Sequence, residues 1–229
     1  MTQKCNIPFK KGIEIQGELH STKRSPTLLI LCHGFTDSKD TPGIKRLAQL
    51  LEQTADVYRF TFTDNINPHL PTEVENVQVI TQYFSRRYNT IVVIGASLGG
   101  LAAVLSAPRI KHMHKLILIN PFAYFFKKIA WRFRKVLIVG IVLAPFVSKA
   151  RENLLFYFRT FAPRSIRYPS LVVVSTHDQL VHPSHGHTLY RELASSQKKL
   201  ILDDEIDHGL TKDIYLQKVA RYIINWLSQ

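Results

Sequence analysis

Short runs of apolar residues alternate along the chain with stretches in which apolar residues recur every three or four positions. The first pattern predicts strands that are buried on both faces, and the second predicts helices that cover a sheet. Their alternation is typical of an α/β fold with a mostly parallel central sheet and helices on both faces. The predicted strands cover residues 27–32, 57–62, 90–94, 115–120, 170–175 and 199–202, and the predicted helices cover 44–53, 72–84, 98–107, 184–195 and 212–227.

Two local patterns near the start of the chain give sharper expectations. Residues 13–19 alternate between apolar and polar positions, which predicts an antiparallel strand at the edge of the sheet. Thr72 precedes an apolar helical stripe and Glu75 stands three residues later, so we expect Thr72 to cap the N-terminus of that helix.

The alternation stops between residues 122 and 168, where the chain is aromatic and basic and has no strand pattern. We interpret the chain as a single α/β domain over residues 1–229 with a helical cap insert at 122–168. The longest apolar run of the insert, residues 136–147, is interrupted by Pro145 and is shorter than the roughly 20 residues of a membrane span. We therefore expect a cap helix over a pocket, or a segment that lies at a membrane interface.

Charge is concentrated in the same segment. The chain carries a net charge of +13, and residues 122–168 hold ten basic residues against Glu152 alone, which gives this segment +9. A field of one sign attracts anionic partners, which here could be a membrane surface, an anionic substrate or nucleic acid. The alternative is a basic surface that does no more than keep the protein in solution.

The cysteines and the first residues bear on localisation. Cys5 and Cys32 cannot form a disulfide framework, and Cys32 lies in a predicted buried strand. Residues 1–11 contain no apolar core of a signal peptide. The sequence therefore predicts a cytoplasmic protein, with peripheral membrane association left open by the basic insert.

Residues 95–99 read Gly-Ala-Ser-Leu-Gly and match G-x-S-x-G between a predicted strand and a predicted helix. In that context the motif forms a sharp turn that presents its serine as a nucleophile. Glycines at 95 and 99 avoid the collisions that side chains would make around a strained turn. The pattern predicts Ser97 as the nucleophile; the alternative is a glycine-rich turn with an incidental serine.

A serine hydroxyl needs a base, and the base needs an acid that holds its tautomer. His208 follows the last predicted strand and precedes the last predicted helix, which is the expected place for the base. Asp178 follows the strand after the insert, so the chain order Ser97, Asp178, His208 is that of α/β-type hydrolases. Three aspartates on the histidine's own loop, which we expect to be solvated, are rivals for the acid: Asp203, Asp204 and Asp207.

Acyl transfer also needs two N–H donors for the oxyanion. One is expected from Leu98, directly after the nucleophile, and the other from Phe35, in the loop after the first buried strand. Gly34 lets that loop approach the serine. We expect His33 to order the loop through hydrogen bonds and not to act as the base.

Four segments carry a resemblance to known proteins: Leu-Cys-His-Gly-Phe at 31–35, the serine motif at 95–100, Asp178 followed by Val181, and Asp-His-Gly at 207–209. Together they resemble the serine aminopeptidase-like branch of the α/β-hydrolase superfamily, which includes monoacylglycerol lipases, cinnamoyl esterases and related carboxylesterases. The resemblance covers nearly the whole chain and is weakest at 122–168. It implies an α/β-hydrolase fold and ester hydrolysis through an acyl-enzyme, without a cofactor.

Two departures from that branch concern loops. Residues 64–68 read Asp-Asn-Ile-Asn-Pro where many relatives have a glycine-rich loop, and Ser175 stands where many have glycine. Neither change removes a group of the predicted triad.

Other sites are weaker candidates. His182, His185 and His187 lack an accompanying cluster of cysteines or carboxylates, so we expect no metal site. The chain has no glycine-rich phosphate loop and no dinucleotide fingerprint, and we expect no cofactor. Basic and aromatic residues alternate in the insert, but the predicted triad makes a nucleic-acid partner the weaker interpretation.

The aromatic insert favours a substrate with an apolar acyl or aryl group. We expect a serine hydrolase that cleaves a small to medium hydrophobic ester, such as a monoacylglycerol or a lysolipid. An acyltransferase or peptidase with the same triad is one alternative, and a non-catalytic lipid- or membrane-binding protein on a hydrolase fold is another.

Overall fold

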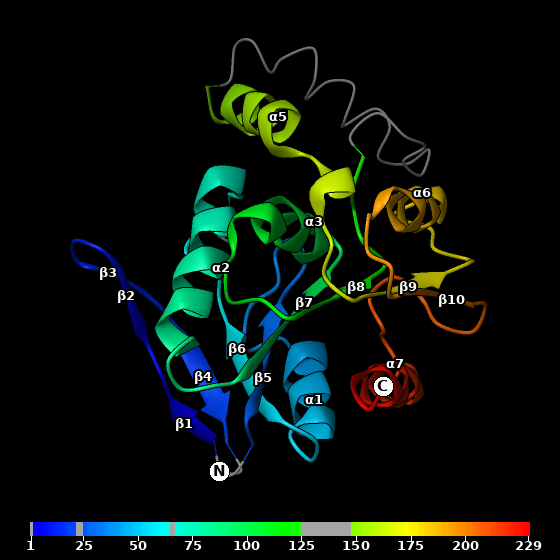
Figure 1. Ribbon diagram of the computed structural model, residues 1–229, viewed down its shortest axis with the longest axis horizontal. Helices are drawn as coiled ribbons and strands as arrows, with labels where there is room; N and C mark the ends of the chain where they lie inside the picture. The colour runs from blue at the N-terminus through cyan, green and yellow to red at the C-terminus, as the bar shows by residue number, and fades with distance from the viewer. Residues whose placement is uncertain (1, 22–24, 65–66, 125–147) are drawn as a thin grey trace.

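The computed structural model describes residues 2–21, 25–64, 67–124 and 148–229. These residues form an eight-stranded sheet, a separate two-stranded sheet, and helices on both faces of the large sheet (Figure 1). The strands are β1 (Thr2–Lys4), β2 (Ile7–Lys10), β3 (Ile13–Ile15), β4 (Gly17–His20), β5 (Thr27–Cys32), β6 (Asp56–Phe60), β7 (Thr90–Ala96), β8 (Lys115–Ile119), β9 (Ser170–Ser175) and β10 (Lys198–Asp203). The helices are α1 (Pro42–Leu51), α2 (Leu70–Phe84), α3 (Leu98–Ser106), α5 (Ser148–Thr160), α6 (Ser184–Glu192) and α7 (Asp213–Leu227), with 3₁₀ turns at Ala107–Arg109 and Pro163–Ser165.

The strands of the large sheet lie in the order β1-β4-β6-β5-β7-β8-β9-β10. The pairs from β6 to β10 are all parallel, whereas β4 is antiparallel to both β1 and β6. The predicted α/β class with a mostly parallel sheet is therefore confirmed. Parallel strands end at one edge of the sheet, so the loops after β5, β7, β8, β9 and β10 gather there.

The central strand β5 shows why the sheet needs helices on both faces. Leu28 and Ile30 belong to the core cluster that includes side chains of α2, α3 and α6, whereas Leu29 and Leu31 belong to the cluster that includes those of α1 and α7. All four side chains are buried, since successive residues of a strand point to opposite faces. The continuous apolar run of this strand is the direct result.

The prediction of one edge strand over residues 13–19 is wrong. The chain bends at Gln16: β3 pairs with β2 in the small sheet, and β4 lies inside the large sheet between β1 and β6. Gly17 lets the ring of Tyr58 lie against the backbone, because a Cβ atom at this position would come within 2.0 Å of the Tyr58 hydroxyl. The alternation of apolar and polar side chains along residues 13–19 does not reveal this packing of Tyr58 on Gly17.

The predicted cap of α2 is also wrong. The helix begins at Leu70, before Thr72, and the Thr72 hydroxyl lies 2.8 Å from Nδ1 of His69. The first N–H of the helix, that of Leu70, donates to Oδ1 of Asn153 in α5 at 2.8 Å, and Nδ2 of Asn153 donates to the carbonyl of Pro68 at 2.9 Å. A residue of the insert thus caps this helix, across 83 residues of chain.

The insert contributes α5 and a 3₁₀ turn to the described residues. Tyr157 of α5 is buried against α2 and α3, and its hydroxyl donates to the carbonyl of Ala123 at 3.0 Å. The apolar run at 136–147, for which a cap helix was predicted, lies outside the described residues. Among the helices that are described, none has the length and apolar character needed to cross a membrane.

Candidate active site

Ser97 occupies the sharp turn between β7 and α3. Its φ of +51° and ψ of −117° are a strained backbone conformation for a residue with a side chain. A Cβ atom on Gly95 would lie 2.5 Å from the carbonyl oxygen of Gly99, and one on Gly99 would lie 2.3 Å from that of His33. The two glycines therefore allow the strand, the turn and the neighbouring loop to approach closely enough to hold the serine.

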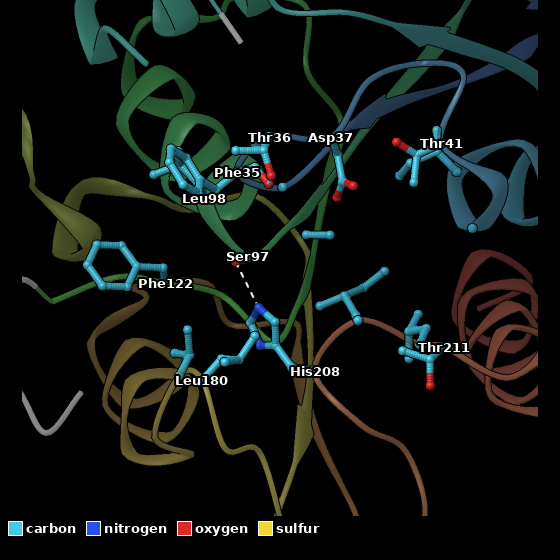
Figure 2. A pocket seen from close by; sticks show the side chains of 18 of the residues that line it. Phe35, Thr36, Asp37, Thr41, Ser97, Leu98, Phe122, Leu180, His208 and Thr211 are labelled. Atoms are coloured by element: carbon cyan, nitrogen blue, oxygen red, sulfur yellow. Dashed lines mark hydrogen bonds between the residues drawn. The ribbon is translucent and has the colours of Figure 1, made fainter. Parts of the chain in front are cut away.

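His208 lies directly against this serine. Its Nε2 atom is 3.0 Å from Oγ of Ser97, as the dashed line in Figure 2 marks. Its Nδ1 atom is 2.6 Å from Oδ2 of Asp178. An ionised carboxylate accepts only, so Nδ1 carries the proton and Nε2 is left to accept the serine proton.

Asp178 is the carboxylate that contacts His208 in this arrangement. Its side chain is only 2% exposed, and its Oδ1 atom accepts hydrogen bonds from the N–H groups of Leu180 and Val181, both at 2.8 Å. Both carboxylate oxygens are therefore engaged, one with the loop and one with His208. This fixes the carboxylate while leaving its charge close to the imidazole.

The rival aspartates have other partners. Asp203 is buried, contrary to the expectation that it is solvated, and binds Lys218 at 2.9 Å and the Tyr222 hydroxyl at 2.7 Å. Asp207 accepts a hydrogen bond from the N–H of Thr211 at 2.9 Å. Asp204 is exposed, as expected. The structure thus brings Ser97, Asp178 and His208 together and assigns these aspartates elsewhere.

The loop that follows β5 lies against the serine. A Cβ atom on Gly34 would be 3.4 Å from the Cβ atom of Ser97. Phe35 and Leu98 are both drawn among the residues that line the cavity around the serine (Figure 2). Within the described residues, the N–H groups of Phe35 and Leu98 form no hydrogen bond. Leu98 also begins α3, whose N-terminus favours negative charge. This is the environment that two oxyanion donors require.

His33 orders that loop, as expected. Its Nδ1 atom donates to the carbonyl of Gly34 at 2.8 Å, and its Nε2 atom accepts from the N–H of Phe62 at 3.1 Å. Burial lowers the pKa of His33, so the ring is neutral in this role. The neighbouring Cys32 is buried, and burial raises the pKa of its thiol far above the usual range, which makes it a poor nucleophile.

A cavity of about 1120 Å³ opens beside Ser97 and His208. Phe122 and Leu180 lie on one side of the serine, and Thr41 and Thr211 lie on the other (Figure 2). Helices α1, α2 and α5 and the segment that leads into α7 all contribute to the lining. Its apolar side chains include Ile44, Leu47, Leu70, Leu154, Val181, Leu210 and Leu216.

Two of the three histidines considered as metal ligands have side-chain hydrogen-bond partners in the protein. His182 Nδ1 lies 2.9 Å from the hydroxyl of Ser184, and the buried His185 Nδ1 accepts from the N–H groups of Ala123 and Tyr124 at 3.3 Å. In the part of the chain that the structure describes, no group of three or more metal-binding side chains is found.

The structure adds a residue that the sequence analysis missed. Asn120, at the end of β8, is buried and has a φ of +44°. Its side chain contacts the backbone of His208 and the end of β9. A polar residue that follows an apolar parallel strand is the signal that could have identified it, because such residues stand at the edge where the site forms.

Comparison with known proteins gives a family and a fold. Residues 29–203 match the family described as serine hydrolase, whereas a comparison with curated protein sequences finds no match. An esterase of Pyrococcus furiosus is 17% identical with a TM-score of 0.78, over 100% of this chain and 90% of that chain. A monoacylglycerol lipase of Paleococcus ferrophilus is 16% identical with a TM-score of 0.77, over 94% of this chain and 98% of that chain.

A third similar structure is the Butyrivibrio proteoclasticus esterase with ferulic acid bound, 15% identical with a TM-score of 0.74, over 98% of this chain and 100% of that chain. At these identities the likeness establishes the α/β-hydrolase fold. The family match spans most of the chain and includes both Ser97 and Asp178. The protein therefore belongs to the serine hydrolase family.

Proposed function

We propose that this serine hydrolase cleaves carboxylic esters with a hydrophobic acyl or aryl group, with Ser97 as nucleophile, His208 as base and Asp178 as the acid that orients it. The observation that carries the proposal is the chain of contacts from Asp178 through His208 to Ser97, at 2.6 and 3.0 Å, beside a largely apolar cavity. A hydrophobic substrate fits such a lining.

In the first half of the reaction, Nε2 of His208 takes the proton of Ser97 as Oγ attacks the ester carbonyl carbon. The N–H groups of Phe35 and Leu98 bind the oxyanion that forms. His208 then gives its proton to the leaving alcohol oxygen, and the carbonyl–oxygen bond of the ester breaks. Water enters, loses a proton to His208, and releases the acid from Ser97 by the same steps in reverse.

Three observations favour a small or medium lipid-like ester. Lining residues of the cavity lie on both sides of Ser97, so an acyl group and an alcohol group can lie on opposite sides of the serine. Two similar structures are a monoacylglycerol lipase and an esterase with ferulic acid bound. Helix α5 lines the cavity through Ala150 and Leu154, which supports a cap role for the insert.

The test is labelling by a fluorophosphonate probe together with turnover of p-nitrophenyl acetate, butyrate, octanoate and laurate. We expect labelling of the wild-type protein and a fall in kcat of about 10⁴-fold or more in Ser97→Ala. Ser228→Ala, an exposed serine after α7, is the matched control and should behave as wild type. Turnover by Ser97→Ala at the wild-type rate would overturn the proposal.

The alternatives give different results in the same assay. A peptidase would cleave aminoacyl p-nitroanilides faster than esters, and an acyltransferase would pass most of the acyl group to an added alcohol instead of water. A non-catalytic lipid-binding protein would bind the fatty acid product and show neither labelling nor turnover.

We also propose that the basic insert holds the enzyme peripherally on anionic membranes. Helix α5 exposes Leu155 and Phe158 next to the exposed Arg151 and Arg159. Apolar and basic side chains on one helix surface suit an anionic lipid interface.

Sedimentation with phosphatidylglycerol vesicles should capture the protein, with phosphatidylcholine vesicles as control. Loss of binding in Arg151→Glu with Arg159→Glu is expected, and no binding by the wild type would refute this proposal.

A further inference from the structure

Asn120 stands at the centre of the edge where the triad assembles. It follows β8, which lies between β7, the strand that leads to Ser97, and β9, the strand that leads to Asp178 (Figure 1). The residue is 3% exposed, and its N–H donates to the carbonyl of Val173 in β9 at 2.9 Å. Its φ of +44° is a conformation that asparagine tolerates better than most residues with a side chain.

The side chain of Asn120 joins two parts of the site. Its Nδ2 atom donates to the carbonyl oxygens of Asp207 and His208, both at 3.1 Å. Its Oδ1 atom accepts from the N–H of Ser175 at 2.7 Å. Two donors and one acceptor of the amide are therefore used, and they connect the backbone of the His208 loop to the end of the strand before Asp178.

The residues on either side of Asn120 reach the serine. The N–H of Ser97 donates to the carbonyl of Ile119 at 3.0 Å, and the N–H of Phe122 donates to the carbonyl of Ser97 at 3.0 Å. The segment from Ile119 to Phe122 thus contacts the backbone of Ser97 directly and the backbone of His208 through the Asn120 side chain.

From these contacts we infer that Asn120 is a positioning residue, which holds the His208 loop so that Nε2 stays within reach of Ser97. The inference rests on the proposed function, because it assigns Asn120 to the same triad. Asn120 touches neither Oγ of Ser97 nor the imidazole in the contacts that place it, so its effect passes through the backbone. A misplacement of about 1 Å in such a base can cost about 10²-fold in rate.

The amide is required because both ends of the side chain must be satisfied. Alanine would leave the carbonyl oxygens of Asp207 and His208 without this donor. Aspartate would keep the acceptor for Ser175 but, when ionised, would turn a second oxygen toward the two carbonyl oxygens. A protonated aspartate can again donate one hydrogen bond to them, so the effect of this variant should depend on pH.

The experiment compares Asn120→Ala and Asn120→Asp with the wild type and with Asn89→Asp, the same change at an exposed position. We expect kcat on p-nitrophenyl butyrate to fall about 10- to 100-fold in Asn120→Ala with little change in KM. In Asn120→Asp the loss should be largest at high pH. Its kcat relative to wild type should rise about tenfold as the pH falls from about 8.5 to about 6, because burial and the facing oxygens favour the protonated acid.

The outcomes separate this inference from the proposed function. An inactive wild type would refute the proposed function. The inference alone would be overturned if the wild type is active and both Asn120 variants have a kcat within twofold of it. The kcat of Asn120→Asp relative to wild type would then also not change with pH. Circular dichroism and thermal melting accompany each assay. If both variants fail to fold while Asn89→Asp folds, the inference is also overturned, because Asn120 then supports the fold and not the placement of His208.

Discussion

One oxygen of Asp178 lies 2.6 Å from Nδ1 of His208, while its other oxygen accepts two backbone N–H groups at 2.8 Å. In Asp178→Asn the amide oxygen should stay with those N–H groups, which turns the NH₂ group toward His208. Nδ1 must then accept, the proton moves to Nε2, and the imidazole can no longer take the proton of Ser97. We expect kcat to fall about 10⁴-fold with KM little changed.

Steady-state kinetics on p-nitrophenyl butyrate and the rate of fluorophosphonate labelling measure this effect. Asp204→Asn, an exposed aspartate on the His208 loop, is the control and should retain wild-type kcat. Equal losses in the two variants would contradict the assignment of Asp178.

The turn that carries Ser97 should be intolerant of side chains. In Gly99→Ala the new methyl group would meet the carbonyl oxygens of His33 and Cys32 at 2.3 and 2.4 Å, and backbone atoms cannot move aside cheaply. Such overpacking costs about 1–3 kcal/mol, and each kcal/mol shifts Tm by about 2–4 °C in a protein of this size.

Differential scanning calorimetry of Gly99→Ala should therefore show a Tm lower by several degrees, with loss of labelling at Ser97. Gly43→Ala in α1 is the matched control, because nothing outside its immediate chain neighbours and its own helix backbone lies within 4 Å of the new methyl group. There alanine should stabilise the helix by about 0.5–1 kcal/mol. A Gly99→Ala protein as stable as Gly43→Ala would contradict the packing described for the turn.

Glu73 in α2 makes stability depend on pH. Burial, with a smaller contribution from the charge of Asp64, raises its pKa to about 8, and its Oε2 atom has no hydrogen-bond partner among the described residues. The folded state holds the proton of Glu73 more tightly than the unfolded chain does. The contribution of this proton to the free energy of unfolding is therefore fully present below about pH 4.5 and declines as the pH rises toward 8.

Glu73→Gln removes this titration. The variant should resemble wild type near pH 4.5 and melt several degrees higher near pH 8.5, since each unit of pKa difference corresponds to about 1.4 kcal/mol. Glu75→Gln, whose carboxylate is exposed on the same helix, should show no such gain. Thermal melts at the two pH values measure the difference, and parallel curves for Glu73→Gln and wild type would count against the raised pKa.

Ile44 of α1 lines the cavity, and a larger side chain there should shorten the acyl chain that fits. In Ile44→Trp we expect kcat/KM for p-nitrophenyl octanoate to fall about tenfold or more relative to the acetate, since each lost or displaced methylene contributes about 1–3 kcal/mol. Tyr83→Trp, exposed on α2, is the control. An unchanged preference in Ile44→Trp would contradict a position of the acyl group against Ile44.

The sequence predicted most of the elements that surround the site, because buried parallel strands and their helices leave strong apolar patterns. The strand at Ser170–Ser175 was predicted to the residue, and the helix after Ser97 was predicted to within one residue of its end. The proximity of Ser97, Asp178 and His208 followed from chain order alone, since each residue comes after a different strand of one parallel sheet.

The sequence did not predict the contacts between segments that are far apart along the chain. Tyr58 packs on Gly17 at the start of β4, and Asn153 caps α2 from 83 residues away. Asn120 holds the backbone of a loop 88 residues further on. Each depends on the position of one side chain in three dimensions, whereas periodicity records only which side of an element is buried.

The parallel pairing of β8 and β9 has a consequence for refolding. β8 ends at Ile119 and β9 begins at Ser170, so this pair forms only after the whole segment between them has been closed into a loop. Closure of a long loop slows the formation of distant contacts. Ser97 precedes this strand pair in the chain and Asp178 follows it, so the two residues come together only when the pair has formed. The helical circular dichroism signal should therefore return before Ser97 becomes reactive. During refolding from denaturant, the time at which reactivity toward the fluorophosphonate probe returns therefore reports when the sheet is complete.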